Sequence, residues 1–116
     1  MNTKNPYEYL KVDCLEDVKP VEAQYPWTIT NCDDERVTIY TSSLEDGSWV
    51  YGYMVCWARK RVSIQEPTAS LGIFRTQREA KLYAIGFFKL YFDYFIDESK
   101  EAIRIAEASL LQASLF

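Results

Sequence analysis

The residues with the clearest potential for chemistry are an acidic run and the set of residue types around it. Asp33, Asp34 and Glu35 are consecutive, and paired carboxylates are the groups that acid–base hydrolysis of glycosides uses. A charge run before a predicted strand is more typical of a solvated loop, and we interpret it as one. The 116 residues contain no histidine, which excludes Ser-His-Asp and Cys-His catalysis. We therefore expect a protein that is not an enzyme.

The cysteines and glycines indicate no cofactor or metal. Cys14, Cys32 and Cys56 are odd in number and widely spaced, so neither a disulfide framework nor a zinc site is predicted. The four glycines are never clustered, as a dinucleotide or phosphate loop would require. The first residues do not resemble a signal peptide, and no stretch approaches the roughly 18 apolar residues of a membrane span. These features predict a cytoplasmic protein that does not contact a membrane.

Aromatic and basic side chains in the middle of the chain offer binding chemistry instead. Aromatic residues make up 16% of the sequence, and they are common at interfaces and stacking sites. Residues 57–81 hold six basic and two acidic residues, a net charge of +4, whereas the whole chain has a net charge of −4. The candidate residues for binding a partner or nucleic acid are Tyr51, Tyr53, Trp57, Arg59, Lys60, Arg61, Arg75 and Arg78.

Most of these side chains need a sheet to position them. Runs rich in Thr, Val, Ile and Tyr predict strands at 27–30, 36–42, 49–58 and 69–74, with further pairing at 62–65. Asp46 and Gly47 form the strongest hairpin signal in the chain. The strand at 49–58 has aromatic residues at most odd positions and smaller residues at even positions, so both of its faces are apolar. We expect a central strand whose small-residue face accepts a helix.

Helices are predicted in the sequence both before the first strand and after the last one. Asn5 before Pro6 predicts a short helix over residues 6–15. Thr76 and Glu79 have the spacing of a capping box at the start of a longer, aromatic-rich helix. Its apolar residues between 80 and 95 span an arc of roughly 180°, wider than the usual stripe of about 100°. A helix buried on most sides and a homodimer interface along 80–95 both fit that arc.

The order of these elements predicts a single domain of the α+β class. Residues 1–26 form an N-terminal segment with a short helix, 27–75 the sheet, and 76–116 two helices, the second from about 98 to 115. We therefore expect an antiparallel β-meander of three to four strands packed against the long aromatic-rich helix and a second C-terminal helix.

The junction between the last predicted strand and the long helix resembles a known DNA-binding family. Residues 71–84 resemble the strand-to-helix junction in the DNA-binding domains of plant ethylene-response factors and in the arm-binding domains of phage integrases. The matching positions are Gly72, Phe74, Thr76, Glu79 and Ala80. In that family a three-stranded sheet lies in the major groove of DNA. By position, the resemblance implies DNA contacts for Tyr51, Tyr53, Trp57, Arg59 and Arg61.

Two functions of different classes remain open. The first is a small regulator or inhibitor that acts through a protein partner, such as an accessory protein of a phage or mobile element. The second is a nucleic-acid-binding protein that stacks bases on the aromatic sheet face and holds phosphates with the basic residues. The acidic chain favours a protein partner, since a negative net charge opposes the approach of nucleic acid. We predict a protein partner in preference to nucleic acid.

Overall fold

The computed structural model describes residues 4–32, 34–57 and 61–113. These residues form a four-stranded sheet and two long helices, and the prediction of an α+β fold with an antiparallel meander is confirmed. The elements in chain order are η1 (Glu8–Leu10), β1 (Tyr25–Asn31), β2 (Arg36–Ser43), β3 (Trp49–Cys56), β4 (Val62–Thr68), η2 (Ala69–Leu71), α1 (Gln77–Leu90), η3 (Phe92–Tyr94) and α2 (Asp97–Ala113), where η denotes a short 3-10 helix.

The sheet has the order β1-β2-β3-β4, and each strand pairs antiparallel with the next. The predicted Asp-Gly turn joins β2 to β3. Gly47 has a φ of 87° there, a conformation that glycine adopts without steric cost, and Leu44 N–H donates to the Ser48 carbonyl at 2.8 Å. The short connections explain why neighbours in sequence are neighbours in the sheet.

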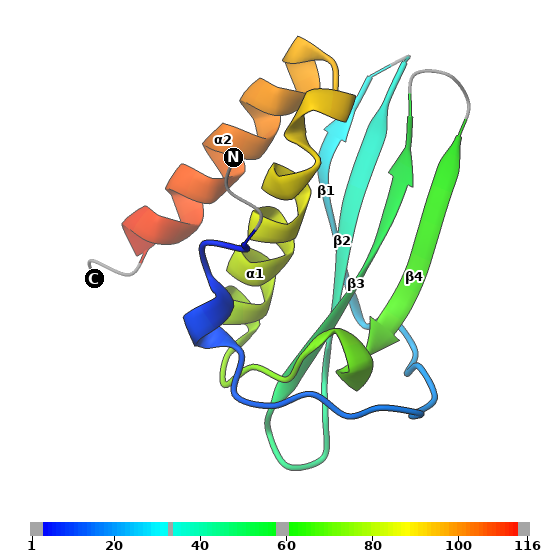
Figure 1. Cartoon of the computed structure of the whole chain (residues 1–116), viewed down its shortest axis with the longest axis vertical. Coiled ribbons are helices and arrows are strands. Elements are labelled where there is room, and N and C mark those ends of the chain that lie inside the picture. Colours follow the sequence, from blue (N-terminus) through cyan, green and yellow to red (C-terminus); the bar gives the residue numbers. More distant parts are fainter. Residues whose placement is uncertain (1–3, 33, 58–60, 114–116) are drawn as a thin grey trace.

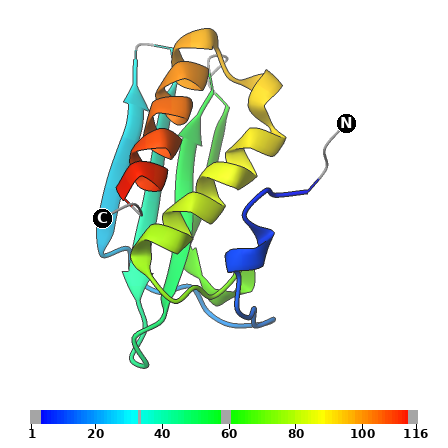
Figure 2. The same ribbon diagram turned by 90° about the vertical axis from the view of Figure 1, so that its left-hand side faces the viewer.

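Both helices lie on one face of the sheet, so the molecule has two layers (Figure 1). Figure 2 shows α2 over the β1 side of that face and α1 beside it, nearer β3. The core fills the space between the layers, where Ile39, Phe74, Phe88 and Ile103 are each 2% exposed or less. Among the described residues, the opposite face of the sheet carries no helix.

The helices pack on the aromatic face of β3. Tyr51 lies 5.8 Å from Tyr83 of α1 between ring centroids, and Tyr53 lies 5.9 Å from Phe88. The prediction that the small-residue face accepts a helix is therefore wrong, because large rings fill the space between a helix and a sheet more fully than small side chains do. Gly52 is small for another reason: a Cβ there would lie 2.2 Å from the Gln65 carbonyl oxygen, where the pairing of β3 with β4 is irregular.

The N-terminal segment lies against the middle of α1. Asn5 Nδ2 donates to the Tyr83 carbonyl at 2.8 Å, and Asn5 Oδ1 accepts the Tyr7 N–H at 2.9 Å. Gly86 makes this close approach possible, since a Cβ at that position would lie 2.0 Å from Asn5 Oδ1. We call this part of the core, around Tyr51, Tyr83 and Phe74, the closed end.

Two predicted elements have a different structure. The predicted helix over 6–15 is wrong, because helical structure is limited to the single turn of η1 and the chain then bridges to Ile73 through Asp13. The predicted strand at 69–74 is wrong for its first half, because the chain turns into η2 directly after β4, although Ile73 and Phe74 form isolated antiparallel bridges to Asp13 and Trp49. Thr68 caps that turn by accepting the Ser70 N–H at 3.2 Å. Pairing with a segment distant in sequence thus prevails over the local helix preference of residues 6–15.

The two long helices begin close to the predicted positions. Thr76 Oγ1 accepts the Glu79 N–H at 3.1 Å and caps α1 as the sequence predicts. α1 ends at Leu90, earlier than the predicted 95, because the chain there turns into η3. α2 has nearly the predicted bounds. Within the described ranges, no helix is long and apolar enough to cross a membrane.

Candidate binding groove

A groove of about 900 Å³ lies between the inner face of β3 and β4 and the C-terminal end of α1. It is at the opposite end of α1 and β3 from the closed end. Seven of its thirteen lining residues are aromatic, and three are polar or charged. Such a combination, mostly apolar with a few polar groups, is typical of sites that bind ligands. We call it the aromatic groove.

β3 supplies one wall of the aromatic groove. Odd-numbered residues of this strand face the helices, so Tyr53 points to the same side as Tyr51, and so does Trp57, which directly follows the strand. Tyr53 packs on Phe87 of α1 at 5.4 Å between ring centroids, and Trp57 packs on Phe95 at 4.6 Å. These contacts hold both rings in fixed positions while leaving each partly exposed.

The end of α1 supplies the other wall. Helical hydrogen bonding ends at Tyr91, whose N–H donates to the Phe88 carbonyl at 3.0 Å, and η3 follows. The resulting bend places Tyr91 and Tyr94 side by side, 6.4 Å apart between ring centroids. Their side chains are 46% and 73% exposed. Exposed tyrosines held by a rigid scaffold are well suited to contact a partner, because they bury a large area at little cost in conformational entropy.

The polar groups of the groove come from β4 and η3. Arg61 is exposed and directly precedes β4, Ser63 lies on the inner side of that strand, and Asp93 belongs to η3. One cationic and one anionic side chain therefore belong to a lining that is otherwise mostly apolar. The groove can accept an apolar or aromatic group and fix its orientation through a charge of either sign.

A buried carboxylate fixes the end of the groove where α2 begins. Glu35 is 2% exposed, and its Oε1 accepts the Ile96 N–H at 3.1 Å, just before α2. A carboxylate at this position satisfies a free N–H group and interacts favourably with the helix dipole. Its Oε2 and Ser99 Oγ are buried without a hydrogen-bond partner among the described residues. The interpretation of 33–35 as a solvated loop is therefore wrong for Glu35, although Asp34 is exposed.

Three tyrosines and one glutamate at the closed end have shifted pKa values. Burial raises the pKa of Tyr51 and of Tyr83 above the ordinary value of a phenol. Burial and a hydrogen bond to Glu107 raise the pKa of Tyr7 as well. Glu8 has a lowered pKa because Lys11 and Tyr83 donate hydrogen bonds to its carboxylate. This network joins the N-terminal segment to both helices.

The structure separates the residues that the sequence grouped as a binding site. Tyr53, Trp57 and Arg61 line the aromatic groove. Tyr51 is 1% exposed in the core, so the prediction that it contacts a partner or stacks on a base is wrong for this fold. Arg59 and Lys60 lie outside the described residues.

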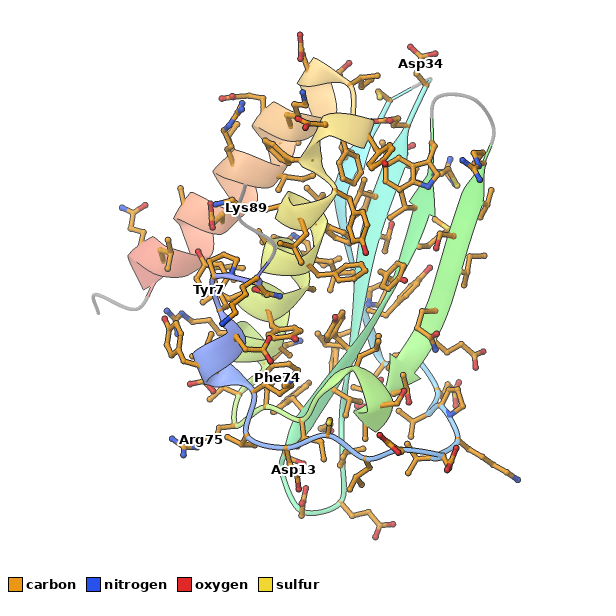
Figure 3. The ribbon with its side chains drawn as sticks, viewed as in Figure 1. Tyr7, Asp13, Asp34, Phe74, Arg75 and Lys89 are labelled. Atoms are coloured by element: carbon orange, nitrogen blue, oxygen red, sulfur yellow. The ribbon has the colours of Figure 1, made fainter. Side chains whose placement is uncertain are left out.

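The remaining two basic residues lie at the closed end, beside the start of α1. Arg75 is exposed, and Figure 3 shows it far from Asp34, which marks the end of the sheet near the groove. Arg78 Nε donates to the Leu110 carbonyl of α2 at 2.9 Å, which gives this side chain a structural contact. The run of positive charge in the sequence is therefore divided between opposite ends of the molecule.

Sequence reasoning missed Phe87, Tyr91, Asp93 and Tyr94 as groove residues. The signal that could have found them was the aromatic arc between 80 and 95. Phe88 and Phe95 are buried, and the exposed part of the arc is where the helix ends and η3 turns over the groove. An arc too wide for the sheet to cover indicates either further burial or a binding surface.

Among the described residues, no group of three His, Cys, Asp or Glu side chains is placed to hold a metal ion. Searches with family models, against curated proteins and against solved structures found no match to this chain.

Proposed function

We propose that this protein is a non-catalytic binding protein, a small regulator or inhibitor, that holds an apolar or aromatic segment of a protein partner in the aromatic groove. The observation that carries the proposal is the groove itself. It combines a volume of about 900 Å³ with two exposed tyrosines at its wall, Tyr91 and Tyr94. A monomeric surface rarely leaves such groups together without a binding role.

The composition of the groove supports a protein ligand. Tyrosine and tryptophan are the residues most enriched at the energetic centres of protein interfaces, and the groove contains three tyrosines and Trp57. Arg61 and Asp93 add one charge of each sign, which suits a peptide that carries its own polar groups. Outside the groove, the net charge of −4 favours a partner with a basic surface.

Nucleic acid is the second candidate ligand, favoured by the position of Arg61. This side chain lies in the same groove as Trp57 and Tyr94, and an aromatic ring beside a cation is the arrangement that binds single strands. The acidic chain opposes it. The variants Arg61→Ala and Arg75→Ala test this second candidate. Arg75 is also an exposed arginine, but it lies at the closed end and so serves as the control.

The proposal is tested with selected peptides. Peptides from a displayed random library are selected on the wild-type protein, and their affinity is measured by fluorescence anisotropy. We expect the double variant Tyr91→Ser/Tyr94→Ser to bind them more weakly by about tenfold or more, since truncating central interface tyrosines has effects of this size. Tyr9→Ser is the control, because Tyr9 is 77% exposed on η1, away from the groove.

The outcome that contradicts the proposal is selection of no peptide, or equal binding by both variants. A parallel titration uses labelled oligonucleotides at low and physiological salt. Binding that weakens with salt, is lost in Arg61→Ala and is kept in Arg75→Ala would support the nucleic-acid candidate instead.

A further inference from the structure

β4 is an edge strand with an uncovered stretch. It is the last strand in the sheet order, and no strand among the described residues pairs with its other side. The chain itself occupies the C-terminal end of this edge, where Val21 N–H donates to the Pro67 carbonyl at 2.8 Å. The stretch from Val62 to Gln65 remains open. Exposed edges of this kind are templates for pairing with a further strand.

The backbone groups of Val62 and Ile64 point away from the sheet. Trp57 N–H donates to the Arg61 carbonyl at 2.7 Å, and antiparallel pairs alternate between bonded and non-bonded. Counted along β4 from the bonded pair of Trp57 and Arg61, the next bonded pairs with β3 are those of Ser63 and Gln65. The N–H and C=O groups of Val62 and Ile64 are directed to the open side.

The side chains on this stretch are unusually apolar for an edge. Val62 is 57% exposed and Ile64 is 63% exposed, on the sheet face that carries no helix. Both lie opposite partly exposed residues of β3, Cys56 and Met54. Proteins usually protect an edge strand with lysine, proline or a bulge, and between Val62 and Gln65 none of these is present.

We propose that β4 pairs antiparallel with β4 of a second copy of this chain, about a twofold axis at Ser63, so that the two sheets become one. In this register Val62 of one copy is opposite Ile64 of the other, and this apolar pair occurs twice. The outward N–H and C=O groups of the two residues then bond to one another. The strand is thus complementary to itself in both its backbone and its side chains.

Charge favours this register over the alternatives. Arg61 is opposite the uncharged Gln65 of the second copy, so this register places no like charges opposite one another at that pair. An axis at Ile64 would place Val62 opposite Glu66, and parallel pairing would bring the two Arg61 side chains together. A second copy therefore fits the edge with one preferred alignment.

The first test is the oligomeric state in solution. Sedimentation velocity over a range of concentrations is expected to show a dimer for the wild type, and association weakened by about tenfold or more for Ile64→Lys, which puts a charge on the shared edge. Ile105→Lys is the matched control, since Ile105 is 61% exposed on α2. A wild type that stays monomeric at its highest soluble concentration overturns the proposal, as does a dimer that both variants weaken equally.

The second test fixes the register. Two Ser63 residues at the axis would form a non-bonded pair with a Cα separation of about 4.5 Å, within the range that a disulfide spans. Ser63→Cys in a Cys14→Ser background should form a covalent dimer on oxidation, whereas Ser109→Cys on the exposed side of α2 should not. Equal cross-linking by both, or none by Ser63→Cys, contradicts pairing about Ser63.

Discussion

The closed end and the aromatic groove are built from the same two elements but differ in accessibility. β3 contributes Tyr51 to one and Tyr53 to the other. α1 contributes Tyr83 to the closed end, and Tyr91, directly after its last residue, lines the groove. Tyr83 is 9% exposed and Tyr91 is 46% exposed. At the closed end, the N-terminal segment covers the rings, whereas no segment among the described residues covers the groove. Similar aromatic pairs thus become core or surface according to a segment distant in sequence.

The largest expected effect is the loss of a ring from the closed end. Tyr51→Ala removes a side chain that contacts Phe74 and Tyr83, and we expect the free energy of unfolding to fall by about 3–5 kcal/mol. Tyr94→Ala in the groove should cost less than about 1 kcal/mol, because that side chain is 73% exposed. Urea unfolding of both variants measures the difference, and equal losses would contradict the distinction between the two ends.

Gly86→Ala is expected to open the closed end without removing a side chain. Its Cβ would lie 2.0 Å from Asn5 Oδ1, so the N-terminal segment must move, at a cost of about 1–3 kcal/mol. Hydrogen exchange should accelerate at the Val12 amide, which donates to the Ile73 carbonyl. In an Asn5→Gly background the same substitution should cost less, and an unchanged cost would show that Asn5 is not the obstacle.

Glu35→Ala tests what holds the groove end in place. The Ile96 N–H loses its acceptor in this variant, and we expect a loss of about 1–3 kcal/mol in unfolding free energy. Glu35→Gln keeps an acceptor oxygen and should lose less. Asp34→Ala, at the exposed neighbour, is the control and should stay within about 0.5 kcal/mol of the wild type in urea unfolding.

The smallest expected effect is the response of the closed end to acid. Glu8 pairs with Lys11 at 2.7 Å and accepts the Tyr83 hydroxyl at 2.9 Å, and its pKa is lowered in the fold. A carboxyl group whose pKa is lowered by folding stabilises the protein at pH values above its unfolded-state pKa of about 4.3. This contribution is lost as the pH falls through the pKa of the folded state. Water screens the pair, because the Glu8 side chain is 51% exposed.

Urea midpoints measured between about pH 6 and pH 3 check this contribution. The wild type should lose more stability over this window than Glu8→Gln, which has no carboxylate to protonate. Identical losses in the two proteins would show that the interactions of Glu8 do not stabilise the closed end.

Local patterns in the sequence were sufficient for most of the fold. The Asp46-Gly47 turn and the Thr76 cap depend on a few adjacent residues, and both are present where the sequence predicts them. Residues 6–15 were predicted wrongly because they pair with a segment distant in sequence. Local propensity contains no information on such pairing.

The candidate site was less accessible to prediction. Tyr53, Trp57 and Arg61 were identified from the sequence, since an aromatic strand that ends in basic residues is visible in a linear pattern. Tyr91 and Tyr94 were not, because their exposure depends on α1 ending at Leu90. The burial of Glu35 depends on the position of α2, which begins more than sixty residues further along the sequence.

The sequence by itself determined the class of the fold, the hairpin order and the starts of the helices, because these follow from periodicity and from interactions between near neighbours. Only the tertiary structure decided which of the aromatic side chains are accessible. That choice depends on which segments cover each end of the β3–α1 layer, and covering is a matter of distant contacts such as that of Asn5 with Gly86. The same residue types therefore form a core at one end and a groove at the other.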